Sequence, residues 1–237
     1  MQFLEPELIK MPGGEYVRGM PPCPPDNKLA HPWTSGEVVL VEPFLLGRYL
    51  VTNVEYRAYL RDTNAPPPSH IDQPDFCQDK QPVVGISWDD ATAYCRWLSD
   101  RSARRYRLPS DSEWEYAARG GRQGTRFPWG DDLSLEHAWF NQQPAPKPVG
   151  SFPANAFGLH DMVGNAWEWC QERFDEVATH TKSINTPTNK PPEMNRVLRG
   201  GSFLTFDPLH LYIAYCHEDP PDLRHHCIGF RIATDIE

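Results

Sequence analysis

The chain has 237 residues, which is enough for one large domain with a sizeable core. Hydrophobic residues make up 39% of it and charged residues 23%, so disordered, collagen-like and coiled-coil proteins are excluded. The formal net charge is −9, which argues against a nucleic-acid partner because non-specific nucleic-acid binding requires a basic face.

Three helices are predicted in the first half of the chain. Each opens with a Ser or Thr followed three residues later by an acid, and then with apolar residues at helical spacing. The expected openings are Thr52 with Glu55, Ser87 with Asp90, and Ser110 with Glu113. The second helix should bury one face, formed by Ala91, Tyr94, Cys95 and Leu98. The third should end at the glycine pair 120–121.

Short strands and long loops are predicted around these helices. The segments 37–41, 43–49, 196–198 and 228–233 contain β-favouring, partly alternating residues. Pro- and Asn-rich loops are expected at 21–25, 64–82, 142–153 and 179–192. With helices in one half and strands at both ends, the chain indicates an α+β fold, formed by a single domain over residues 1–237.

No run of about twenty apolar residues is present, because Glu42 and Pro43 interrupt the best candidate at 38–46. The first ten residues carry acids where a signal peptide has a basic start. We therefore expect a cytoplasmic protein with no membrane partner. The six cysteines form no C-x-x-C pair and are expected to be free and mostly buried.

A series of motifs in fixed order makes the sequence specific. It resembles the sulfatase-modifying-factor family, whose best-known member is the formylglycine-generating enzyme. The motifs that carry this resemblance are MPGGE (11–15), LGRYLVTNVEY (46–56), PVVGISW (82–88), RLPSDSEWEYAARG (107–120), FPWG (127–130), GLHDMVGNAWEW (158–169), RGGS (199–202) and IGFR (228–231). The resemblance implies a variant of the C-type lectin fold, with few helices and twisted antiparallel sheets. It also implies that Arg199, Arg231 and the Trp-Glu-Trp block brace the core.

The family resemblance implies a copper(I) site of two cysteines just after the Gly-Gly-Ser block, where soft thiolates suit a soft ion. Counted from Ser202, those two positions hold Thr205 and His210. A hydroxyl and one imidazole do not make a bis-thiolate site. We therefore expect no copper and no enzyme activity.

Two other metal sites follow from the same resemblance. A structural Ca²⁺ is implied in the loop of Val163, Gly164, Asn165 and Glu168, whose oxygen atoms are the hard ligands that this ion prefers. A rebuilt oxidase site is the alternative, using Cys216 and Cys227 with the histidines at 210, 217, 225 and 226. Adjacent His225 and His226 would point to opposite faces if they lay on a strand.

The segment 203–227 also resembles the variable region of proteins that are diversified by retroelements, in which adenines of Asn codons are mutated. The segment contains no Lys, Gln, Met or Trp, which such mutation of a codon ending in C or T cannot produce, although Glu218 is an exception. The candidate ligand-binding residues are Phe203, Leu204, Thr205, Phe206, His210, Tyr212, His217, Leu223, His225, His226 and Cys227.

The leading interpretation is a non-catalytic domain that binds a protein or other macromolecular ligand through residues 203–227, since exposed aromatic side chains contribute strongly to interfaces. The alternative is a metal-dependent oxidase or modifying enzyme that acts on a peptide or a small molecule. A regulatory or structural module is the third possibility. A neighbouring reverse-transcriptase gene would favour the first.

Overall fold

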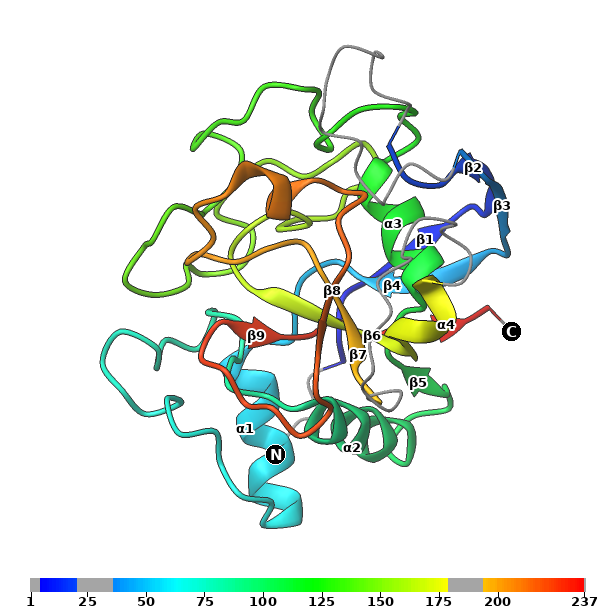
Figure 1. The fold of residues 1–237 in the computed structure, drawn as a ribbon. Coiled ribbons are helices and arrows are strands. Elements are labelled where there is room, and N and C mark those ends of the chain that lie inside the picture. The colour runs from blue at the N-terminus through cyan, green and yellow to red at the C-terminus, as the bar shows by residue number, and fades with distance from the viewer. Residues whose placement is uncertain (1–4, 21–35, 179–193, 237) are drawn as a thin grey trace.

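The structure is a computed structural model that describes residues 5–20, 36–178 and 194–236 (Figure 1). The predicted loops at 21–25 and 179–192 lie outside the described residues, as does Cys23. None of the helices in the described ranges has the length and apolar character needed to cross a membrane.

The three predicted helices are confirmed as α1 (Asn53–Thr63), α2 (Trp88–Ser99) and α3 (Asp111–Arg119). In α3 the Ser110 hydroxyl accepts the Glu113 backbone N–H at 3.1 Å, and the Glu113 carboxylate accepts the Ser110 N–H at 2.7 Å. Gly120 then ends the helix with a φ of 57°, a left-handed conformation that favours glycine. A short helix, α4 (Phe174–Ala178), and a 3-10 helix (Pro208–Leu211) complete the set within the described ranges.

Within the described residues the strands form two four-stranded sheets and one two-stranded sheet. The first sheet has the order β1-β4-β10-β5 and the second β8-β7-β6-β9, while β2 pairs with β3. All pairs are antiparallel except β6 with β9. The strands are β1 (Leu8–Met11), β2 (Gly14–Val17), β3 (Val38–Val41), β4 (Phe44–Gly47), β5 (Tyr106–Arg107), β6 (Trp167–Arg173), β7 (Arg196–Arg199), β8 (His217–Asp219), β9 (Ile228–Gly229) and β10 (Ala233–Asp235).

The sequence patterns located β3, β4 and β7 but were wrong at the C-terminus. The predicted strand 228–233 is divided into β9 and β10, which belong to different sheets, so the chain crosses between the sheets at 230–232. The longest strand, β6, was not predicted, because its first four residues are all buried and show no alternation. Few helices and several sheets nevertheless give the α+β fold that the sequence predicts.

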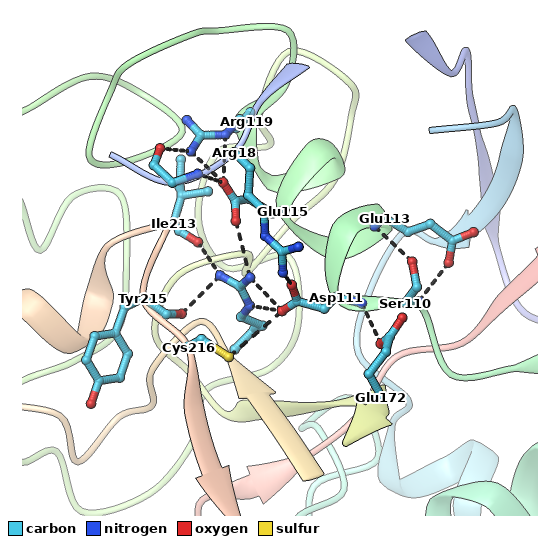
Figure 2. A network of polar contacts seen from close by, with 12 residues as sticks. Arg18, Ser110, Asp111, Glu113, Glu115, Arg119, Glu172, Ile213, Tyr215 and Cys216 are labelled. Atoms are coloured by element: carbon cyan, nitrogen blue, oxygen red, sulfur yellow. Dashed lines mark hydrogen bonds and ion pairs between the residues drawn. The ribbon is translucent and has the colours of Figure 1, made fainter. Parts of the chain in front are cut away.

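Buried arginines brace the core, as expected from the sequence. Arg231 is fully buried and donates two hydrogen bonds to the Glu168 carboxylate, at 2.5 and 2.7 Å. Arg199, at the end of β7, bonds both Asp111 and Glu115 of α3. Figure 2 shows the acids of α3 surrounded by these partners, with Arg18 and Arg119 donating to the same two carboxylates. The network ties α3 to the second sheet.

Candidate functional site

The segment 203–227 connects β7 to β9 (Figure 1, orange to red). It contains only the 3-10 helix and β8 as regular elements, and the remainder is turns. Backbone hydrogen bonds from neighbouring loops hold it in place: Phe203 N–H donates to Asn165 O at 3.0 Å, and Gln143 N–H donates to Phe203 O at 2.9 Å. The segment is therefore a fixed part of the surface.

Exposure divides the eleven predicted ligand-binding residues into two groups. Phe206 is 69% exposed, the largest value among the exposed hydrophobic side chains of the described chain. His225 is also exposed, and six others are half-buried: Leu204, His210, Tyr212, His217, Leu223 and His226. Eight of the predicted positions thus have side-chain surface available to a ligand.

The other three residues are buried, so the prediction that they face a ligand is wrong. Phe203 is fully buried because it packs edge-on against Phe76, at 6.2 Å between ring centroids. Thr205 is 8% exposed and its hydroxyl accepts the Ser202 backbone N–H at 3.0 Å. Cys227 is 6% exposed and belongs to the main hydrophobic cluster. These residues support the segment from below.

Stacked rings cover one part of the segment. The ring of Tyr215 lies 4.5 Å from that of His210, and the ring of His217 lies 5.3 Å from that of Trp167. The sequence did not single out Tyr215 or Trp167 as site residues, because Trp167 belongs to a motif read as core. We call Phe206, His210, Tyr215, His217, His225 and His226 the aromatic face.

His225 and His226 lie at a turn just before β9 and not on a strand, so the condition under which they would point to opposite faces is not met. Their ring centroids are 4.4 Å apart. His70 and Phe76, from the long loop between α1 and α2, also contact the ring of His226, at 5.4 and 6.3 Å. No local pattern could have brought that loop here, since its position depends on the tertiary fold.

Burial and neighbouring groups lower the pKa of two imidazoles of the aromatic face. Burial lowers the pKa of His217, although Asp219 lies 3.6 Å away and acts in the opposite direction. Burial, together with His225 and His70, lowers the pKa of His226. Both shifts favour the neutral ring, which presents an aromatic surface without a desolvated charge.

The two cysteines near the segment do not form a thiol pair. Cys216 lies in the hydrophobic cluster that includes the buried side chains of α3. Its Sγ is 3.9 Å from Asp111 Oδ1, and burial raises the pKa of its thiol. Cys227 lies in the other cluster, with its Sγ 3.0 Å from His225 Nδ1, and burial raises its pKa to about 11. In the described ranges no group of three or more His, Cys, Asp or Glu side chains is arranged to hold a metal ion.

The predicted calcium loop is packed tightly against its neighbours. Asn165 has a φ of 62°, and its amide exchanges two hydrogen bonds with the backbone of Lys147, at 3.0 and 3.2 Å. Both oxygens of Glu168 accept hydrogen bonds from Arg231, and one also accepts the Trp114 indole N–H at 2.8 Å. The oxygen ligands suit Ca²⁺ in type, but an ion here has to share Glu168 with a guanidinium.

The profile of the family described as "Sulfatase-modifying factor enzyme 1-like domain" matches residues 1–236. The serine/threonine-protein kinase Pkn1 of Chlamydia trachomatis is 31% identical over 100% of this chain, which corresponds to 39% of that relative's length. The formylglycine-generating enzyme of Streptomyces coelicolor is 36% identical over 66% of this chain and 53% of its own length. This chain thus spans between two fifths and about half of these curated relatives.

Two solved structures are similar over nearly all of both chains. The structure of PvdO from Pseudomonas aeruginosa has a TM-score of 0.76 and 29% sequence identity, covering 98% of this chain and 95% of that one. The Treponema denticola variable protein 1 has a TM-score of 0.74 and 20% identity, covering 97% of this chain and 95% of that one, which shows a shared fold.

Proposed function

Since the chain belongs to the sulfatase-modifying factor enzyme 1-like family, we propose that it is a binding member of that family, which holds a protein ligand on its aromatic face and oxidises nothing there. The observation that carries the proposal is Phe206, a large apolar side chain left 69% exposed on a backbone that is otherwise fixed. Burial of such a ring at an interface is a typical source of binding energy.

The chemistry of the former copper positions supports the same proposal. Thr205 and His210 provide one hydroxyl and one imidazole, and the remaining thiols of Cys216 and Cys227 lie in separate clusters. Soft, two-coordinate Cu(I) needs two thiolates close together. The aromatic face therefore lacks the pair of sulfur ligands that the family resemblance implies for a copper oxidase.

A protein ligand fits this face better than a charged polymer does. The rings of Tyr215, His210 and His217 are stacked and partly buried, so they lose little conformational entropy on binding. The acids Glu218 and Asp219 on β8 lie at the same segment and disfavour a polyanion. A partner with an apolar centre and basic rim is the chemistry that this face complements.

The test is cross-linking followed by measured affinity. A photoreactive phenylalanine analogue at position 206 should capture a partner in the source cells, and the purified partner should then bind the wild-type domain. Phe206→Asn should weaken that binding by at least about tenfold, the loss of one interface anchor. The matched control is Leu40→Asn on β3, a residue of similar exposure at 65%. Equal losses in both variants, or none in Phe206→Asn, would contradict the proposal.

We propose in addition that the segment 203–227 is diversified by a retroelement. A solved structure with this fold carries the name of a variable protein, and the amino-acid types of the segment, Glu218 excepted, are ones that adenine mutation of an Asn codon can produce. The expected genomic finding is a reverse-transcriptase gene beside the coding sequence and a near-copy of its 3′ end that differs at adenines. A locus without either feature would remove this part and leave the binding proposal standing.

The oxidase alternative has one observation in its favour, the 3.0 Å contact between Cys227 Sγ and His225 Nδ1. A thiol beside an imidazole is a potential nucleophile or half of a metal site. Oxygen uptake with a thiol peptide, after loading with Cu(I), should stay at background and be equal in wild type and Cys227→Ser. Turnover that Cys227→Ser abolishes would favour the oxidase over the binding module.

A further inference from the structure

A second candidate site, separate from the aromatic face, is a pocket of about 220 Å³ between two loops of the described chain. Residues 122–137 form one wall and residues 153–163 form the other, so no residue of the 203–227 segment lines it. The volume suits a small molecule and not a macromolecule. This inference is therefore independent of the proposed protein ligand.

The pocket wall combines apolar and polar side chains. Leu159, Met162 and Val163 line it, together with Trp129. The indole of Trp129 already stacks with Phe127 at 5.4 Å and with His137 at 5.0 Å between ring centroids. The aliphatic side chains of the wall suit a compact aliphatic group.

One carboxyl oxygen in the pocket wall is available to accept a hydrogen bond from a cationic ligand. Asp161 lines the pocket and is 7% exposed. Its Oδ2 accepts the Gly150 backbone N–H at 2.8 Å, whereas no donor in the described part of the chain reaches Oδ1. Asp161 forms no ion pair in these ranges; burial raises its pKa, and the nearby charges of Arg231 and His160 act in the opposite direction. Its Oδ1 is therefore the carboxyl atom available to a ligand that displaces water from the pocket.

Arg122 contributes the opposite charge at the mouth. It lines the pocket, its side chain is exposed, and no carboxylate in the described ranges pairs with it. A guanidinium in this position recognises a carboxylate with two parallel hydrogen bonds. The pocket therefore has a carboxyl oxygen in its wall and an exposed cation among its lining residues.

We propose that this pocket binds a small aliphatic ammonium compound, with the ammonium at Asp161 Oδ1, the branched body against Leu159, Met162 and Val163, and any ligand carboxylate at Arg122. A branched-chain amino acid combines all three features. Because Asp161 binds the ammonium and Arg122 binds the carboxylate, such a zwitterion has one favoured orientation in the pocket.

The first test needs no variant. Wild-type protein is titrated with isoamylamine and with isoamyl alcohol, its neutral isostere, by calorimetry or by NMR up to about 10 mM. Isoamylamine should bind saturably and at least about tenfold more tightly than the alcohol, because only the ammonium makes a charge-assisted hydrogen bond. Failure of the amine to bind, or equal binding of both compounds, would overturn the proposal.

Two variants then assign the contacts. Asp161→Asn keeps an acceptor for the Gly150 N–H and tolerates the φ of 57°, so it should fold, and its melting temperature is checked. It should weaken isoamylamine binding by at least about tenfold. Arg122→Gln should weaken binding of leucine severalfold and leave isoamylamine unchanged. Unaltered amine binding in Asp161→Asn refutes the ammonium contact, and unaltered leucine binding in Arg122→Gln refutes the carboxylate contact.

Discussion

Arg199 is the residue at which the buried charges of the molecule converge. Its guanidinium bonds Asp111 and Glu115 and also donates to the carbonyl oxygens of Ile213 and Tyr215, at 3.0 and 3.2 Å. The Arg199 side chain is 1% exposed, as are both acids. Burial acts to raise the pKa of Asp111, but the guanidinium charges of Arg199 and Arg18 outweigh burial and lower it. The three charges are stable only together.

Arg199→Met should therefore destabilise the domain by about 3–5 kcal/mol, because it removes the guanidinium that Asp111 and Glu115 share and leaves each buried carboxylate with one cation, Arg18 and Arg119 respectively. The free energy of unfolding in urea measures this. The control is Arg224→Gln, which breaks a pair with Asp90 at 2.7 Å in which Arg224 is 52% exposed, and should cost at most about 1 kcal/mol. Similar costs for both variants would show that the buried network contributes no more than a surface pair.

Glu172 should make stability depend on pH near neutrality. Its carboxylate accepts the Asp111 N–H at 2.8 Å, and burial followed by the charge of Asp111 raises its pKa to about 7. An acid whose pKa is higher in the folded state stabilises that state while protonated. The contribution is complete below the unfolded-state pKa of 4.5 and is lost as the pH rises through about 7.

Glu172→Gln should consequently match the wild type in stability at pH 4 and exceed it at pH 8 by about 1–3 kcal/mol. Urea unfolding at both pH values, beside the exposed control Glu136→Gln, measures the difference. A wild-type deficit that is the same at pH 4 and pH 8 would mean that Glu172 does not titrate in this range.

The elements that the sequence identified best are the capped helices, since their signals are local. Ser87 and Ser110 each cap a helix through a hydroxyl and receive a reciprocal bond from an acid three residues on. The four predicted core residues of α2 (Ala91, Tyr94, Cys95 and Leu98) are all at most 2% exposed. In contrast, the loop 163–166 that precedes β6 carries no periodic signal, and its position depends on contacts with distant residues such as Trp139 and Gly200.

Calcium in that loop remains a prediction, and thermal melting tests it. If Val163, Gly164, Asn165 and Glu168 hold Ca²⁺, EDTA should lower the melting temperature, at about 2–4 °C per kcal/mol of binding free energy lost. Ca²⁺ should restore the original value and Mg²⁺ should not, because Mg²⁺ demands a tighter octahedral shell. A melt that is identical with EDTA and with Ca²⁺ would leave Glu168 as the partner of Arg231 alone.

At the scale of the whole molecule, the fold separates a rigid support from a surface that can vary. Phe203 and Phe206 are three residues apart, yet one is fully buried and the other 69% exposed. Phe203→Ala should therefore cost about 3–5 kcal/mol, whereas Phe206→Asn should change the free energy of unfolding by no more than about 0.5 kcal/mol. Urea unfolding of the two variants measures this, and a large cost for Phe206→Asn would mean that the aromatic face also serves stability.

The sequence by itself determined the family and the three capped helices, because each of these depends on residue types at fixed local spacing. Only the tertiary structure decided that Phe203, Thr205 and Cys227 are buried, that His70 and Phe76 contact His226, and that Asp161 opens into a pocket. Burial and contact within long irregular loops depend on segments far apart in the chain. No short window of sequence contains that information, because neither loop is periodic and each takes its position from the sheets and helices against which it packs.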